Sequence, residues 1–486
     1  KTGRPGGLIA GVVYAEQERR GQGQDDHAHE PLQIHTVPDR RSLPAGLAGA
    51  GAALAEGPQA AADVRLAGYG PQRGTAQLAV EQRLQQLPAP DAFRRHLERI
   101  TQDPHIAGSG ANAAVARYLG AAMEAAGLEV AYHDYDVYLP EPDPQAQVAL
   151  VTPVRLPLNN QEDILPEDPY TAHAALAPGW NAFSASGDVT AEVVYVNYGR
   201  KEDFDWLRGA GVSLEGKLAL ARYGGNYRGF KARYAEAAGA LGVIIYTDPA
   251  DNGYMTGLPY PQGTAYTSST VERGSLLTLA YTGDPLTPFA PALPLDGHRK
   301  VARLSPEQAG LPRIPVTPLP YGSGVAIVRR MTGEPVPRAW QGGLPCTYRL
   351  TGGPELTVRL RVDQPKGIRR ITDVVGTLRG SELPDEWIIL GCHYDAWSFG
   401  AEDPNGGSAM LLTLAEALGQ MAREGVRPRR TVKIAHWDAE EFGMIGHALH
   451  IGMHVQRAEA AGEGLVLIRL QTFLAAHDDH LVVEEG

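Results

Sequence analysis

Apolar residues near the start of the folded region recur at the spacing of amphipathic helices. Leu78 to Leu87 predicts one helix, Phe93 to Ile100 a second and Asn112 to Ala126 a third. Gly127 follows the third helix, where glycine commonly caps a helix because it adopts positive φ without strain. The run from Leu128 to Val137 then predicts a strand. The folded part therefore begins with helices followed by a strand.

Short β-branched and aromatic runs dominate the middle of the chain. Val193 to Tyr198, Leu218 to Tyr223 and Gly242 to Tyr246 predict strands bounded by turn residues. A short helix, Phe230 to Ala240, lies between the last two strands. Because this Pro-rich region differs from its flanks, we interpret residues 141–350 as a mostly β module inserted into the first domain.

An alternation of strands and helices returns after the inserted module. Leu356 to Val362 alternates as a strand, and Trp387 to Cys392 is a continuous apolar run typical of a buried strand. Ser408 to Met421 predicts an amphipathic helix, and Thr431 to Trp437 another strand. Strand, helix and strand in this order imply a right-handed crossover and a parallel pair.

The changes of pattern and composition along the chain predict its domain boundaries. Residues 76–140 and 351–446 form the two parts of one α/β domain around the insertion. Residues 1–75 are rich in Gly, Ala, Gln, Arg and Pro and lack periodicity, so we interpret them as disordered or foreign low-complexity sequence. Residues 447–486 form a tail that does not match the pattern before it.

Charge and cysteine content exclude some classes of function. The formal net charge of -12 disfavours nucleic acid as the main partner, because binding phosphates requires a basic face. The two cysteines, Cys346 and Cys392, provide no disulfide framework. No apolar run is long enough for a transmembrane helix.

Potential metal ligands follow the ends of two predicted strands. His393 ends the first strand, Asp403 lies in the loop after it, and the pair Glu440 and Glu441 follows the second. Open α/β sheets place their sites at the C-terminal ends of parallel strands. Imidazole and carboxylate groups are ligands of zinc, which lowers the pKa of bound water to about 7. The pattern therefore predicts a zinc site that activates water.

Each of these residues also has an alternative role. A single histidine at a strand end is commonly a hydrogen-bonded residue, and a pair of glutamates is commonly a solvated surface. In the metal interpretation, one glutamate binds the metal and the other accepts a proton from water. Asp395, two residues after His393, is placed to accept a hydrogen bond from the second ring nitrogen and fix the tautomer.

Several segments of the chain resemble one group of peptidases. They are G-C-H-Y-D-A-W-S-F-G-A-E-D-P-N-G-G, R-P-R-R-T-V-K-I-A-H-W-D-A-E-E-F-G-M-I-G, I-T-D-V-V-G-T-L-R-G, A-R-Y-G-G-N-Y-R-G-F-K and G-D-P-L-T-P. The resemblance is to the di-zinc peptidases of the glutamate carboxypeptidase II and transferrin receptor group. It covers about residues 75–446 and stops after Gly446.

The resemblance implies a fold and a set of roles. The fold is a zinc-aminopeptidase-type α/β domain, with a mixed sheet flanked by helices and an inserted, mostly β protease-associated (apical) domain. The implied roles are that His393 binds one zinc, Asp403 bridges two, Glu441 binds the other and Glu440 is the general base. Arg228 matches an arginine that holds the C-terminal carboxylate of the substrate, which guanidinium can do with two hydrogen bonds.

The resemblance also implies an activity and its limits. We expect a zinc-dependent exopeptidase of the carboxypeptidase or dipeptidase type that acts on small peptides. A further acidic ligand is expected near residues 467–470, but these read Leu467-Ile468-Arg469-Leu470. We therefore interpret the chain as C-terminally truncated, with an incomplete ligand set and impaired activity. The alternatives are a non-catalytic, receptor-like binding module or an inactive fragment.

Partners and location follow only from the resemblance. Members of the group form homodimers through a C-terminal domain that the sequence does not match. The group also implies an extracytoplasmic or membrane-anchored location.

Overall fold

The computed structural model describes residue 66, residues 69–450 and residues 465–469. The chain divides into two compact units, and helix α1 (Pro71–Gln86) crosses the boundary between them at Arg83. The helix confirms the first predicted periodic segment. The interpretation of residues 1–75 falls almost entirely outside the described residues. All other described elements belong to the larger unit.

The first sheet has five strands in the order β1-β11-β13-β12-β14. They are β1 (Glu129–Pro140), β11 (Lys366–Leu378), β12 (Leu383–His393), β13 (Arg430–Trp437) and β14 (Leu465–Arg469). β12 is parallel to β13 and β14, whereas β11 is antiparallel to β1 and β13. The predicted parallel pair is confirmed. β14 lies in the tail for which the sequence predicted no matching element.

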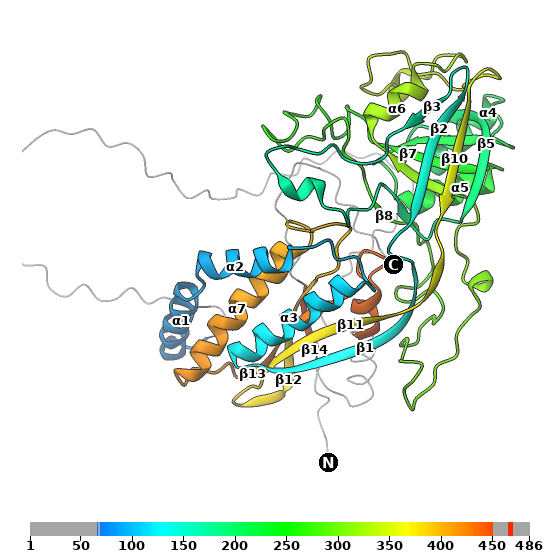
Figure 1. Cartoon of the computed structure of the whole chain (residues 1–486). Coiled ribbons are helices and arrows are strands. Elements are labelled where there is room, and N and C mark those ends of the chain that lie inside the picture. The colour runs from blue at the N-terminus through cyan, green and yellow to red at the C-terminus, as the bar shows by residue number, and fades with distance from the viewer. Residues whose placement is uncertain (1–65, 67–68, 451–464, 470–486) are drawn as a thin grey trace, which may run out of the picture. The chain divides into compact units, whose positions relative to one another are not determined.

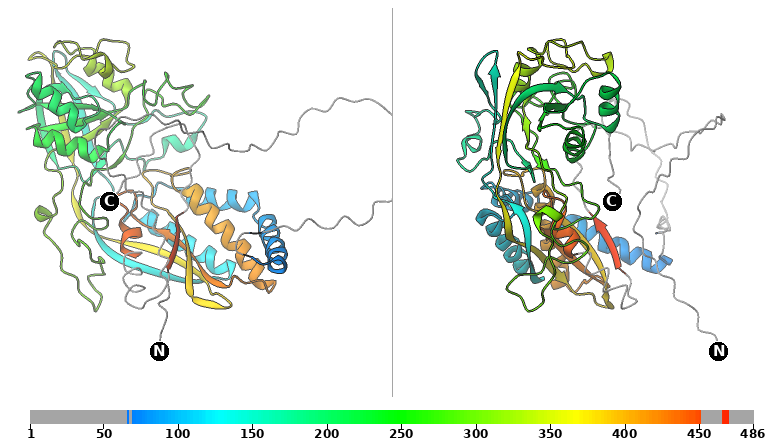
Figure 2. Two further views of the ribbon diagram at one scale, coloured as in Figure 1. Left: turned by 180° about the vertical axis from the view of Figure 1, so that it is seen from behind. Right: turned by 90° about the vertical axis from the view of Figure 1, so that its right-hand side faces the viewer.

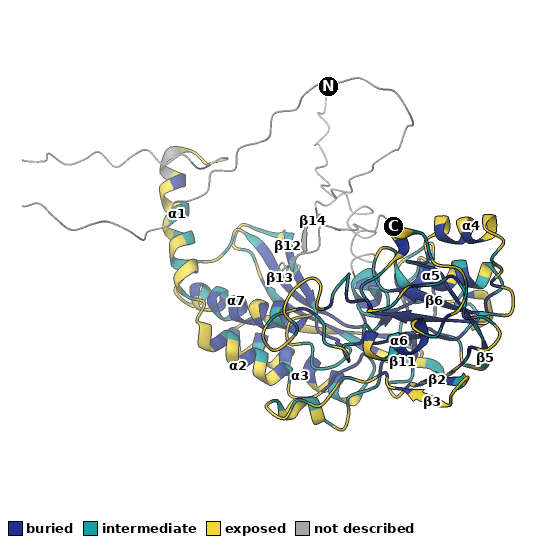
Figure 3. Ribbon diagram, turned by 90° about the horizontal axis from the view of Figure 1, so that it is seen from above, coloured by how far each residue is buried: buried dark blue, intermediate teal, exposed yellow. Residues whose placement is uncertain are grey.

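Helices α3 (Gly110–Ala126) and α7 (Asn405–Arg423) pack on this sheet, and α2 (Pro90–Ile100) packs against α7 (Figure 1). Leu119 of α3, Leu411 of α7 and Ile434 of β13 belong to the same buried apolar cluster. In Figure 3 the strands are largely dark blue, whereas α2 carries a yellow, exposed outer face. The apolar residues that recur at helical spacing in the sequence therefore form the buried face of each helix.

The ends of α3 follow from its capping residues. The Ser109 side chain accepts a hydrogen bond from the Asn112 amide at 3.1 Å, which satisfies a donor that the helix itself leaves unpaired. Gly127 ends the helix with a φ of 96°, so the predicted glycine cap is confirmed.

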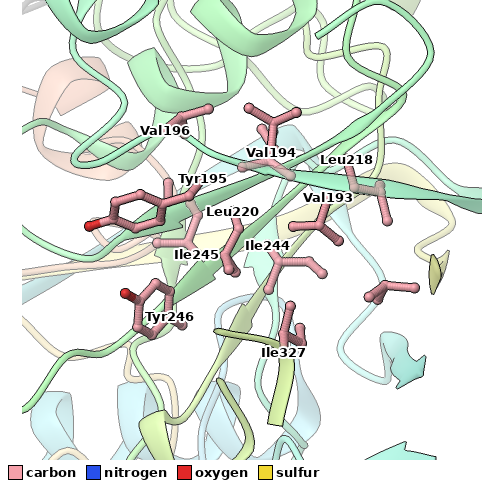
Figure 4. Packing of buried hydrophobic residues seen from close by; sticks show 14 of the residues in the cluster. Val193, Val194, Tyr195, Val196, Leu218, Leu220, Ile244, Ile245, Tyr246 and Ile327 are labelled. Atoms are coloured by element: carbon pink, nitrogen blue, oxygen red, sulfur yellow. The ribbon is translucent and has the colours of Figure 1, made fainter. Parts of the chain in front are cut away.

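The second sheet has seven strands in the order β3-β2-β10-β5-β6-β7-β9. They are β2 (Gln145–Thr152), β3 (Leu156–Leu158), β5 (Gly187–Tyr195), β6 (Leu218–Arg222), β7 (Gly242–Tyr246), β9 (Val316–Leu319) and β10 (Thr357–Asp363). Helices α4 (Lys201–Gly209), α5 (Arg228–Ala237) and α6 (Tyr321–Val328) belong to the same region. Strands β5, β6, β7 and β9 are parallel neighbours. Their buried side chains, among them Val193, Leu220 and Ile244, form the core shown in Figure 4.

Smaller elements complete the described chain. β4 (Asn181–Ala182) pairs in parallel with β8 (Gly274–Ser275). Short 3₁₀ turns are found at Pro169–Ala172, Pro306–Gln308 and Arg338–Trp340. None of the described helices has the length and apolarity that a membrane span requires.

One described strand of the inserted sheet lies outside the predicted bounds of the inserted domain. β10 lies in the segment 351–446 that the sequence assigned to the first domain, yet it pairs with β2 and β5 of the inserted sheet. The inserted sheet therefore extends to Asp363. The alternating pattern of a single strand shows which face is buried, but it does not show which sheet the strand joins.

The chain enters and leaves the insertion along a two-stranded ribbon. β1 continues into β2, β10 continues into β11, and the Glu141 amide bonds the Pro365 carbonyl at 2.8 Å between the two sheets. β1 in cyan and β11 in yellow run side by side in Figure 2. Backbone pairing therefore continues from one sheet to the other.

Gly419 tests how tightly α7 packs against the end of α3. A Cβ atom at Gly419 would lie 1.8 Å from the Ala126 carbonyl oxygen. We expect Gly419→Ala to lower the free energy of unfolding by about 1–3 kcal/mol, because the helices must separate. Urea unfolding followed by circular dichroism measures the change. Gly209→Ala is the control, since no atom lies within 4 Å of its added Cβ. An equal effect of both substitutions would contradict the packing described for α7.

Candidate functional site

The ends of β12 and β13 bring most of the predicted site residues together. His393 is the last residue of β12 and stands in register with Trp437, the last residue of β13. The Nε2 atom of His393 lies 3.2 Å from Asp403 Oδ1 and 3.7 Å from Glu440 Oε2. The parallel pairing of the two strands therefore places an imidazole beside two carboxylates that are far apart in sequence.

Glu441 belongs to the same electrostatic cluster. Burial raises the pKa of the Glu441 carboxyl well above its ordinary value, and the nearby Asp403, Asp395 and Glu440 carboxylates raise it further. His393 acts in the opposite direction on this pKa. The Glu441 carboxyl therefore interacts electrostatically with the imidazole and with the three other acids.

His393 lies in a strongly negative environment. Its side chain is 12% exposed, whereas that of Asp403 is 80% exposed. Burial lowers the pKa of His393, but the carboxylates of Glu440, Asp395 and Asp403 outweigh it and raise that pKa well above the ordinary value. Hydrogen bonding to His393 in turn lowers the pKa of Asp403. Such an arrangement favours a bound cation.

The donor types fit zinc. One imidazole nitrogen and several carboxylate oxygens face one another, and these are the ligand atoms that zinc binds in catalytic sites. Within residues 69–450, no three His, Cys, Asp or Glu side chains converge in a complete metal-binding geometry. The chemistry of the donors thus fits the metal, and a bound ion would have to draw the carboxylates closer together.

Asp395 connects the two strand ends, and this role was missed by the sequence prediction. Its fully buried carboxylate accepts the Glu440 amide at 2.9 Å and the Glu441 amide at 3.3 Å. Its Oδ1 atom is also 3.5 Å from Nδ1 of His393, and its carbonyl oxygen is 3.2 Å from the same nitrogen. The carboxylate that was predicted to orient the imidazole therefore also holds the backbone of both glutamates.

A second buried layer lies beneath Asp395. The Asp438 carboxylate accepts hydrogen bonds from the Asn112 side chain at 2.7 Å and the Tyr394 hydroxyl at 2.8 Å. The Asp438 amide donates to Asp373 at 2.9 Å. Burial, together with Asp395, raises the pKa of Asp438 to about 7. Its position immediately after β13 was the only sequence signal for this layer.

The loop that carries Asp403 is held by a segment far away in sequence. The Asn405 side-chain amide lies 2.9 Å from Nε2 of His105, and the His105 amide donates to the Ser398 carbonyl at 3.1 Å. His105 is fully buried, and its Nδ1 atom lies 2.8 Å from the Asp103 carbonyl oxygen. The segment around His105 therefore contacts the Asp403 loop at two places, Ser398 and Asn405.

The first turn of α7 supports the strand end directly. The Ser408 hydroxyl lies 2.8 Å from the His393 carbonyl oxygen and 3.0 Å from Nδ1 of the fully buried His436. Because the hydroxyl reaches both strands, it ties the end of β12 to β13.

Arg228 lies at the first turn of α5, in the inserted domain. Its Nη2 atom donates to the Tyr223 hydroxyl at 3.3 Å, and its guanidinium lies 5.7 Å and 5.8 Å from the ring centres of Tyr223 and Tyr227. Within the described part of the chain, no ion pair or hydrogen bond joins Arg228 to His393 or to the acids around it. The structure therefore brings together the metal-site candidates but gives Arg228 a separate environment.

A short path of contacts leads from Arg228 to the glutamate pair. Gly274 of β8 lies against the Arg228 guanidinium, so closely that a Cβ atom would be 2.2 Å from its Cζ. The next residue, Ser275, donates its hydroxyl to the Phe442 carbonyl at 3.0 Å. Phe442 directly follows Glu441, so β8 connects the arginine to the segment after β13.

Family models match two regions of the chain. Peptidase family M28 matches residues 373–461, and the PA domain matches residues 189–275. The first match contains His393, Asp403 and the glutamate pair, and it extends past Gly446, where the sequence interpretation ended the resemblance. The second match contains Arg228, most of β5, and strands β6 and β7 of the inserted sheet.

Curated relatives match over most of this chain. A glutamate carboxypeptidase 2 homolog from Caenorhabditis briggsae is 37% identical over 380 residues, covering 73% of this chain and 47% of the relative. Aminopeptidase NAALADL1 from Mus musculus is 35% identical over 376 residues, covering 73% of this chain and 49% of the relative. The chain thus spans about half the length of these relatives.

A solved structure is also similar. The peptidase M28 precursor from Shewanella amazonensis SB2B has a TM-score of 0.48 at 16% identity, covering 82% of this chain and 74% of that chain. With its PA domain and its peptidase family M28 segment, the chain is a relative of the glutamate carboxypeptidase group.

Proposed function

We propose that this chain is a zinc-dependent exopeptidase that releases the C-terminal residue of small peptides. The observation that carries the proposal is the meeting of His393 with Asp403 and Glu440 at the ends of β12 and β13. In this proposal His393 would bind one zinc, Asp403 would be shared by two, and Glu441 would bind the second. The match to peptidase family M28 over the same residues supports it.

The proposed chemistry divides between the metal and the protein. Zinc, when bound, supplies a Lewis acid that makes water a stronger acid. Glu440, whose backbone is held by Asp395, accepts a proton from the attacking water and passes it to the departing amine. Arg228 binds the terminal carboxylate of the peptide through parallel hydrogen bonds. In this proposal the two adjacent glutamates therefore have different roles.

The metal is expected to bind weakly. The group resemblance requires another acidic ligand near the end of β14, and that strand ends at Arg469. Each zinc would therefore have few ligands, and we expect the peptidase activity to be impaired. A homodimer and an extracytoplasmic location stay predictions from resemblance.

Glu440→Gln tests the general base. At saturating zinc we expect slow hydrolysis of N-acetyl dipeptides by the unchanged chain. The substitution should reduce kcat by about 10²–10⁴-fold, since the amide cannot accept the proton. Glu382→Gln is the control, because Glu382 is 59% exposed and forms an ion pair with the exposed Arg429. Unchanged hydrolysis in Glu440→Gln, or no hydrolysis by the unchanged chain, would refute the proposal.

Zinc titration tests the proposed ligands. Isothermal titration calorimetry should show zinc binding in the micromolar range or weaker, and His393→Ala should abolish it, since the only imidazole in the set is removed. Two tightly bound zinc ions per chain would contradict the expected weakness. Unaltered binding in His393→Ala would show that the ion binds elsewhere.

Asp395→Asn tests the link between the strand ends. The asparagine keeps the size of the side chain, but its amide nitrogen cannot accept the bond from one of the two glutamate amides. We expect kcat or zinc affinity to fall by about 10–100-fold, as is typical for groups that orient metal ligands. Asp188→Asn, at an exposed ion pair with Arg359, is the control. Equal activity and zinc affinity in both variants would argue against the role assigned to Asp395.

A further inference from the structure

A second charged side chain, Glu272, lies beside the arginine in the inserted domain. The Tyr266 hydroxyl donates to the Glu272 carboxylate, and the Tyr223 hydroxyl also hydrogen-bonds with it. Tyr223 accepts a hydrogen bond from Arg228 as well. One phenol therefore bridges a guanidinium and a carboxylate, and the two charges act on each other electrostatically.

Neither charge is cancelled by a direct ion pair. Among the described residues, no ion pair joins Glu272 to Arg228, and the neighbouring Arg273 instead pairs with Glu162 at 2.7 Å. Glu272 is only partly buried. The Nε atom of Arg228 is buried and has no hydrogen-bond partner among the described groups. Within the described chain, Arg228 therefore retains a donor without a partner, and the partly buried Glu272 carboxylate has more acceptor sites than the tyrosine hydroxyls occupy.

A short segment of chain connects Glu272 and Arg228 to the glutamate pair at the end of β13. Glu272 lies two residues before Gly274, which contacts the Arg228 guanidinium. Ser275 then bonds the carbonyl of Phe442, directly after Glu441. The segment from Glu272 to Ser275 thus connects the charged pair to the proposed catalytic residues.

We propose that Glu272 selects peptides whose C-terminal residue carries a positively charged side chain. The inference rests on the proposed function, in which Arg228 binds the terminal carboxylate. A lysine or arginine side chain next to that carboxylate would face the Glu272 carboxylate and be attracted to it. A second carboxylate, as in a C-terminal glutamate, would be repelled. Selection by charge therefore combines an attractive contact with a repulsive one.

Peptide binding without turnover tests this selection. Isothermal titration calorimetry is performed on the full chain carrying Glu440→Gln, at saturating zinc, with N-acetyl-alanyl-lysine and N-acetyl-alanyl-glutamate. We expect the lysine peptide to bind about tenfold more tightly, a difference that a single charge contact can supply. Adding Glu272→Gln, which keeps the size of the side chain, should bring the ratio of the two affinities close to one.

Controls separate a local contact from a general charge effect. Glu382→Gln removes the same charge from an exposed position and should leave the affinity ratio unchanged. Sodium chloride should reduce the ratio in the chain that retains Glu272, because salt screens the contact. This second measurement does not depend on the folding of a Glu272 variant. A preference for the glutamate peptide, a ratio that Glu272→Gln does not change, or no binding of either peptide would overturn the inference.

Hydrolysis of a neutral peptide separates this inference from the proposed function. N-acetyl-alanyl-leucine is incubated with the chain that retains Glu440. Absence of hydrolysis, together with a lysine preference that depends on Glu272, would refute the peptidase proposal and support the selection. Hydrolysis of this peptide, with an affinity ratio that Glu272→Gln does not change, would support the peptidase proposal and refute the selection by Glu272.

Discussion

The candidate site depends on the buried carboxylate of Asp395. It follows β12 by two residues, yet it accepts the amides of Glu440 and Glu441, which follow β13. Backbone pairing aligns the two strands up to His393 and Trp437, but it cannot fix the residues beyond the last pair. A charged acceptor shared by two amides extends that alignment into the loops, where hydrogen bonds to an ionised group are stronger than neutral ones. The imidazole and the acids consequently lie close together.

Hydrogen bonds from several distant parts of the chain also hold the residues around Asp395 in place. Asn112 of α3 reaches Asp438, the preceding turn holds the Asp403 loop through His105, and α7 supports His393 through Ser408. Each of these contacts joins segments that are distant in sequence. The inserted domain adds Ser275 of the short β4–β8 pair, which donates its hydroxyl to the Phe442 carbonyl and so contacts the same segment. The site is therefore a product of the whole larger unit.

Much of this arrangement could be predicted from the sequence, because its main signals are local. Apolar periodicity identified α3, β12, α7 and β13, and Gly127 marked the end of α3. The rule that parallel strands end at one edge of a sheet placed His393 near the glutamate pair. The alternating pattern predicted the strand β10 but not its pairing with β2, since such a pattern shows burial and not the neighbouring strand. The amide bonds of Asp395 and the partners of Glu272 depend on tertiary contacts that no sequence spacing reveals.

The most direct test of the central claim is an anomalous difference map, recorded at the zinc absorption edge from crystals of the chain grown with zinc. We predict a peak bounded by Nε2 of His393 and the carboxylates of Asp403 and Glu441, with the Glu440 carboxylate nearby. A map without a peak at the ends of β12 and β13, or with its only peak at a distant position, would contradict it.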